Sequence, residues 1–286
     1  MALLWNSLAT RKVDLLAQAL ASRFSIPDGT AWVNYVRVHD DIGWTFSDED
    51  AALLGMNAYD HRQFLNEFYR GRFPGSFARG LPFQENPATG DCRISGTCAS
   101  LARLEKALTE EGPEEVELAI KRILLIHGLI LTVGGIPLLY LGDEIGTLND
   151  YSYLDDPAHA RDSRWVHRPH VDWDKYEKRH APESIEGRVF QRLHRLISIR
   201  KENEVFSAEG LQVISTGSEH VLGFVRSHNE YQALVLANFS ESEQSLPVEI
   251  TNQFGRVIHG CQELGSNRAG ESSMKIPPYG FLIFME

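Results

Sequence analysis

The spacing of hydrophobic positions changes near residue 206. Before that point, apolar residues recur at helical intervals in three segments, residues 2–24, 113–132 and 185–200. Two apolar runs, residues 31–38 and 136–141, lie between them and are typical of strands, the second of a strand covered on both sides. The order helix, strand, helix, strand, helix indicates a parallel sheet or barrel of the α/β class.

From Phe206 onward the hydrophobic pattern has a period of two. The stretch "HVLGFVRSHNEYQALVLANFS" predicts two strands that meet at His228-Asn229, and "YGFLIFME" predicts a closing strand. We therefore expect two parts, an α/β region over residues 1–206 and a small all-β domain over residues 207–286.

Composition narrows the possible partners. The chain has 286 residues with 28 basic and 39 acidic side chains, and 28 − 39 gives a net charge of −11. This acidity argues against nucleic acids and anionic membranes as partners. No apolar run is long enough to span a bilayer.

Cysteine and histidine spacing gives no sign of a metal site. Cys92, Cys98 and Cys261 are an odd number without ligand spacing, so we expect free thiols and a cytoplasmic location. The histidines of the polar segment lack the spacing of a closed metal site; they are His159, His167, His170 and His180. No glycine-rich loop in the sequence has the pattern of a phosphate-binding loop. We predict neither a metal nor a cofactor.

The first helix begins at the second residue without a capping residue before it. We expect from this that Met1 was once internal to a longer chain.

Acidic residues follow both predicted barrel-type strands. The first strand leads into His39, Asp40 and Asp41, and the second leads through a glycine into Asp143 and Glu144. In (β/α)₈ barrels the active site forms where strands end at their C-terminal face. The alternative for each acid is a solvated loop or a helix N-cap.

Several longer motifs resemble one family. They are "NYVRVHDDIGW", "YDHRQF", "RFPGSFARGLPFQENPATGDCRISGT", "GGIPLLYLGDEIGTLND" and "DSRWVHRP", and they are similar to amylosucrases of the α-amylase superfamily, glycoside hydrolase family 13. This resemblance implies the C-terminal part of a (β/α)₈ TIM barrel, with an insertion at about residues 45–112 after the seventh strand, followed by an all-β sandwich domain.

The resemblance also implies an activity. Amylosucrases cleave sucrose and transfer the glucosyl unit to an α-1,4-glucan with retention. Asp40 corresponds to the acid that stabilises the transition state, and His39 to the histidine beside it. Hydrogen bonds from these side chains to sugar hydroxyls strengthen as the ring approaches an oxocarbenium ion. Arg164 corresponds to the arginine at the floor of the glucosyl pocket, where it pairs with an acid upstream.

Other positions correspond to substrate-binding residues of the family. Asp41 and Arg93 correspond to residues on the acceptor or fructosyl side of the family's site, and Asp91 orients Arg93. Arg62 and Gly43 correspond to positions on the glucan-binding surface. The substrates implied are sucrose and an α-glucan.

The family's nucleophile and acid/base belong to earlier strands that this sequence does not contain. We therefore expect a fragment that is inactive alone and associates with a missing N-terminal half or with itself. Two alternatives remain, a sucrose hydrolase with the same scaffold and a non-catalytic carbohydrate-binding remnant. The second depends on aromatic residues of the insertion: Phe64, Phe68, Tyr69, Phe73, Phe77 and Phe83.

Overall fold

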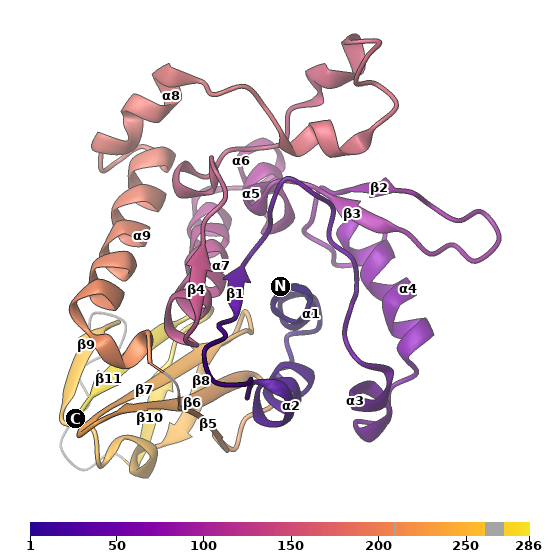
Figure 1. The fold of residues 1–286 in the computed structure, drawn as a ribbon. Helices are drawn as coiled ribbons and strands as arrows, with labels where there is room; N and C mark the ends of the chain where they lie inside the picture. The colour runs from indigo at the N-terminus through magenta and orange to yellow at the C-terminus, as the bar shows by residue number, and fades with distance from the viewer. Residues whose placement is uncertain (209, 261–271) are drawn as a thin grey trace.

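The computed structural model describes residues 1–208, 210–260 and 272–286 (Figure 1). Its α-helices are α1 (Ala2–Thr10), α2 (Asp14–Arg23), α3 (Asp48–Leu53), α4 (Ala58–Tyr69), α5 (Cys98–Leu101), α6 (Leu104–Glu110), α7 (Pro113–Thr132), α8 (Trp173–Glu177) and α9 (Ile185–Glu202). Its strands are β1 (Val33–Tyr35), β2 (Leu81–Phe83), β3 (Arg93–Ser95), β4 (Ile136–Leu138), β5 (Leu211–Ile214), β6 (Val221–His228), β7 (Tyr231–Asn238), β8 (Gln244–Pro247), β9 (Arg256–His259), β10 (Ser273–Ile276) and β11 (Phe281–Met285). None of the helices in the described part has the length and hydropathy that crossing a membrane requires.

The predicted first helix is two helices. The chain leaves α1 at Arg11, whose φ of 60° is left-handed, and α2 begins at Asp14. The expectation of one continuous helix is wrong because a left-handed residue ends the hydrogen-bond ladder. The break places Trp5 on the core side, where its indole nitrogen donates to the carbonyl of Val36 at 2.9 Å.

Strands β1 and β4 form a two-stranded parallel sheet, with Val33 opposite Ile136. Helix α7 contacts both strands, and β1 and β4 lie side by side in Figure 1. The prediction that residues 136–141 are covered on both sides is wrong: Ile136 is 57% exposed and Leu141 64% exposed. Within the described residues, β4 pairs with β1 alone, so its other edge has no strand beside it.

The segment between β1 and α7 folds into α3, α4, the β2–β3 hairpin, α5 and α6. Its aromatic residues pack mainly on one another, with Phe68, Tyr69 and Phe77 at most 1% exposed. The segment is tied to the end of β1 by a β-bridge between Ile42 and Ile94, with N···O distances of 2.7 and 2.9 Å.

The C-terminal residues form an antiparallel five-stranded sheet in the order β5-β6-β7-β11-β9, together with a β8–β10 ribbon. The predicted hairpin is confirmed, since β6 and β7 pair through His228 and Tyr231 and Asn229 turns at φ 53°. Helix α7 lies against this sheet, and one hydrophobic core includes residues of both parts. Cys261 lies outside the described residues.

Candidate functional site

The side chains of His39 and Asp40 lie together at the end of the segment that follows β1. His39 Nε2 is 3.3 Å from Asp40 Oδ2, and the two side chains are 63% and 50% exposed. Two guanidinium groups approach the other carboxylate oxygen, Arg164 at 3.3 Å and Arg168 at 3.4 Å. Asp40 is therefore held by cations while its carboxylate stays open to solvent.

Arg164 is positioned by the short 3-10 helix η3 (Ser163–His167). Asp162 caps this helix by accepting from the Arg164 backbone N–H at 3.0 Å, and it also binds the guanidinium, with Nη2 2.8 Å from Oδ2. The bond from Arg164 keeps the pKa of Asp162 below its usual range. The guanidinium also lies over the ring of Phe83, 4.4 Å from its centroid. Arg164 thus pairs with two acids, Asp162 close by in sequence and Asp40 from the loop after β1.

The loop that carries Asp40 is fixed through the carbonyl of His39. This oxygen accepts from Arg168 Nε at 2.7 Å and from His167 Nε2 at 3.0 Å. His167 Nδ1 accepts from the Gly96 N–H at 2.9 Å, so its proton is on Nε2. Burial lowers the pKa of His167 to about 4, which keeps the ring neutral. Sequence reasoning did not single out Arg168 and gave His167 no role, although both directly follow "SRWV".

A buried ion pair lies beneath this loop. Arg37 Nε donates to Asp143 Oδ1 at 2.7 Å, and both side chains are 1% exposed. The interpretation of Asp143 as a solvated loop acid is wrong, because Arg37 compensates the cost of burying its charge. Glu144 Oε2 accepts from the Gly142 N–H at 2.7 Å, and burial raises the pKa of Glu144.

Asp41 pairs with an arginine of the β2–β3 hairpin. Its carboxylate is 3.5 Å from Arg93 and only 7% exposed, while Arg93 is 56% exposed. Arg93 therefore pairs with Asp41, and Asp91 is an exposed residue of the hairpin loop. The structure brings Asp41 and Arg93 together, and the charge of Asp41 also acts on Arg164.

Arg62 and Gly43 lie farther along the same segment. Arg62 donates to the carbonyls of Trp44 and Phe46 at 3.1 Å each, and it pairs with Asp48. These bonds occupy most of its guanidinium and fix the chain after Gly43.

A cleft of about 520 Å³ borders the network on the side of the long polar loop. His167 and Arg168 form part of its wall, so it adjoins the loop that carries Asp40. The rest of the lining is mixed in polarity and includes Tyr140, Glu144, Asn149, His170, Asp172, Lys175 and Tyr176. A mixed lining of this kind suits a ligand with several hydroxyl groups.

The chemistry available around Asp40 is charge stabilisation and hydrogen bonding. The carboxylates joined to its network, Asp41 and Asp162, are each held by an arginine. The bond from Arg164 keeps the pKa of Asp162 low and favours the ionised form, which cannot serve as a general acid.

Comparison with known proteins adds to this geometry. Residues 221–283 match the model of the C-terminal domain of the α-amylase SusG. Glucosylglycerate phosphorylase of Escherichia coli K12 is 24% identical over 263 residues, covering 90% of this chain and 42% of that protein. Trehalose synthase of Thermus thermophilus is 25% identical over 282 residues, covering 91% of this chain and 25% of that protein. The chain is similar to enzymes of the α-amylase superfamily.

Among solved structures, sucrose 6F-phosphate phosphorylase from Thermoanaerobacter thermosaccharolyticum is similar in fold. The TM-score is 0.56 with 14% identity, covering 83% of this chain and 42% of that one. The chain therefore spans less than half the length of each of these relatives. The activity of a complete enzyme containing this chain is accordingly a proposal.

Proposed function

We propose that this chain is the C-terminal portion of an amylosucrase-like retaining glucosyltransferase that cleaves sucrose and transfers glucose to an α-1,4-glucan. The observation that carries the proposal is the exposed His39–Asp40 pair, held by Arg164 and Arg168 at the end of a parallel strand. The similarity to α-amylase-superfamily enzymes over nine tenths of the chain supports it. In this proposal β1 and β4 are strands of a (β/α)₈ barrel that continues outside this sequence.

Each side chain then has a defined part. Asp40 and His39 hydrogen-bond hydroxyls of the glucosyl ring, and these bonds strengthen as the ring acquires oxocarbenium character. Arg164 closes the floor of the glucosyl pocket beside them. Asp41 and Arg93 face the leaving-group or acceptor side, and the segment from Gly43 to Arg62 contributes to the glucan surface.

The same geometry leads us to propose that the chain alone does not turn over sucrose. A retaining glycosidase needs a nucleophile and an acid/base about 5–5.5 Å apart. The bond from Arg164 keeps Asp162 ionised, so Asp162 is not suited to the acid/base role. Removing a nucleophile abolishes nearly all of the rate enhancement.

The aromatic insertion does not favour a non-catalytic binding function. The rings of Phe68, Tyr69 and Phe77 are buried in mutual contacts and cannot stack on a sugar. Phe83 lies under the Arg164 guanidinium. Of the aromatic residues assigned to that alternative, Phe73 keeps a substantial exposed face, at 42%.

The test is complementation. The chain is co-expressed with the N-terminal half of an amylosucrase, which carries the family's nucleophile and acid/base, and the assembled complex is purified and given sucrose. We expect fructose release and α-glucan, with neither from the isolated chain. Asp40→Asn should lower kcat by at least about 100-fold with a smaller change in KM, because its hydrogen bonds act mainly in the transition state.

Product analysis separates the remaining alternative. Free glucose without glucan would show a sucrose hydrolase instead of a transferase. An assembled complex that releases no fructose would contradict the proposal.

A further inference from the structure

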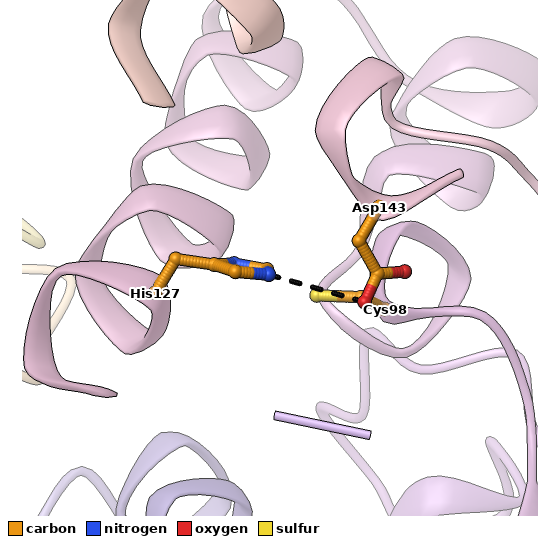
Figure 2. Close-up of side chains that lie close together, drawn as sticks. All are labelled: Cys98, His127 and Asp143. Atoms are coloured by element: carbon orange, nitrogen blue, oxygen red, sulfur yellow. Dashed lines mark ion pairs between the residues drawn. The ribbon is translucent and has the colours of Figure 1, made fainter. Parts of the chain in front are cut away.

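Three buried side chains from distant parts of the sequence meet behind the Arg37–Asp143 ion pair. Cys98 begins α5, His127 lies in the middle of α7, and Asp143 begins the 3-10 helix η1 (Asp143–Ile145) after β4. Their side chains point toward one another in Figure 2, and each residue is at most 2% exposed. One sulfur, one nitrogen and one oxygen atom lie within 4.8 Å of one another.

Two of these atoms are acceptors that face each other without a donor. His127 Nδ1 lies 2.7 Å from the carbonyl of Ile123, which can only accept, so Nδ1 carries the proton and Nε2 has a free lone pair. Nε2 is 3.9 Å from Asp143 Oδ2, and neither atom has a hydrogen-bond partner among the described residues.

Leaving these atoms unpaired is costly. A buried polar group without a partner costs about 1–3 kcal/mol, and such groups are rare in native proteins. The thiol of Cys98 has one proton and can satisfy only one of the two acceptors. The arrangement therefore lacks a positive or donating centre between the three side chains.

We propose that Cys98, His127 and Asp143 bind one Zn²⁺ ion, with a water molecule as the fourth ligand. Thiolate, imidazole and carboxylate are the ligand types that Zn²⁺ takes in proteins, whereas Mg²⁺ and Ca²⁺ prefer oxygen alone. A thiolate and a carboxylate together carry two negative charges that offset those of the ion, and the cation of Arg37 beside Asp143 leaves the cluster with one net positive charge. On binding, the Cys98 thiol loses its proton to solvent and the other two ligands bind as they stand.

The groups around the ligands fit this proposal. A metal-binding histidine normally donates its other ring N–H to a carbonyl or carboxylate, as His127 does to Ile123. Asp143 uses one oxygen for Arg37, which orients the carboxylate and leaves the second oxygen for the ion. Zinc bonds of about 2.0–2.3 Å place tetrahedral ligands roughly 3.3–3.8 Å apart, so the cluster needs to contract by about 1 Å at its widest separation.

No local sequence pattern indicates this site, because its ligands are far apart along the chain. Cys98, His127 and Asp143 belong to three separate elements, and ligand spacing reveals only sites whose residues are neighbours in sequence. The site would connect α5, α7 and η1 beneath the loop that carries Asp40. Its three protein ligands all belong to this chain, and the site does not depend on the proposed glucosyltransferase activity.

Zinc and cobalt binding to the purified, untagged 286-residue protein test the proposal. We expect about one equivalent of Zn²⁺ by mass spectrometry. Substitution with Co²⁺ should give visible tetrahedral bands and a near-ultraviolet thiolate charge-transfer band. Tm should rise by about 5 °C when free zinc exceeds its Kd roughly 100-fold.

Matched variants identify the ligands. Cys98→Ser should abolish the charge-transfer band and His127→Gln should weaken metal binding at least about 10-fold. Two control variants lie outside the cluster: Cys92→Ser removes a buried thiol, and His259→Gln removes a partly buried imidazole. Both should leave metal binding unchanged. A wild-type protein that takes up no Zn²⁺ and gives no Co²⁺–thiolate band would overturn the proposal. A buried water would then be the group that donates to His127 Nε2 and Asp143 Oδ2. A band that survives Cys98→Ser would overturn it as well.

Discussion

His167 supports the loop that carries Asp40 by donating to the carbonyl of His39. Its pKa is lowered to about 4, first by burial and further by Arg37 and Arg168, while its bond to the His39 carbonyl and the charge of Asp162 oppose the shift. Protonation would place an N–H against the Gly96 N–H that Nδ1 now accepts.

This shift predicts a loss of stability in mild acid. The folded pKa of His167 is below the value of about 6.5 in an unfolded chain, so the neutral ring favours folding. The contribution is complete above pH 6.5 and is lost as the pH falls toward 4, to a total of about 3 kcal/mol. Urea unfolding measured from pH 7 to pH 4 should show this decline.

His167→Asn is the matched variant, because its side-chain oxygen can still accept from Gly96 without titrating. We expect a flatter pH profile than in the unmodified protein. His259, whose pKa burial also lowers to about 4, should contribute a separate share that His259→Asn removes. If the His167→Asn profile superimposes on that of the unmodified protein, His167 does not control the acid response.

The sequence predicted the residues of this site that directly follow a strand. It did not predict the contacts between residues that lie far apart along the chain. His39, Asp40 and Arg164 do meet, although the roles assigned to them remain predictions. The contact of His167 with Gly96 spans 71 residues and that of Arg37 with Asp143 spans 106, and no local pattern encodes either. Arg62 and Asp41 contact Asp48 and Arg93, and the substrate-binding roles assigned to them remain predictions.

At the scale of elements, α7 is the helix on which both parts of the chain pack. Gly128 is in the helix where it meets β11: a Cβ built there would lie 2.6 Å from the Phe281 ring. The glycine therefore permits close approach of helix and sheet.

Gly128→Ala should destabilise the protein although alanine favours helices. Alanine gains about 1 kcal/mol of helix propensity over glycine. Overpacking against Phe281 costs about 1–3 kcal/mol, so we expect a net loss of up to about 2 kcal/mol in the free energy of unfolding. Chemical denaturation measures it, with Gly255→Ala as a control because nothing lies within 4 Å of a Cβ at that position. Equal or greater stability of Gly128→Ala would show that Phe281 moves aside at little cost.

Periodicity predicted the long elements well for a physical reason. Helix α9 buries one face, while α7 over residues 125–132 and six consecutive residues in each of β6 and β7 are buried throughout, and these apolar residues are visible in sequence. The break at Arg11 was not visible, because a non-glycine residue in the left-handed region has no local signature there. Likewise, the apolar run after α7 predicted a strand but could not show how many neighbours the strand has.

At the scale of the whole molecule, β1 and β4 leave apolar side chains in solvent. Val33 is 50% exposed, Ile136 57% and Leu141 64%, and all three lie in or directly beside the two-stranded parallel sheet. Parallel sheets are normally covered on both faces, and unpaired edges promote association. A barrel partner of the kind proposed above would cover these positions.

We therefore expect the isolated chain to self-associate. In size-exclusion chromatography with light scattering it should exceed its monomer mass of 32.2 kDa, and it should bind a dye that fluoresces on apolar surfaces. Replacing Ile136 and Leu141 together by lysine should lower both signals, because charges at these positions oppose edge-to-edge contact. Leu53→Lys is the control: Leu53 is 73% exposed on α3, away from the sheet, and its replacement should change neither signal. If the unmodified chain is monomeric and binds no dye, the exposed apolar side chains of β1 and β4 are stable in water without a partner. A surrounding barrel would then not be needed to explain their exposure.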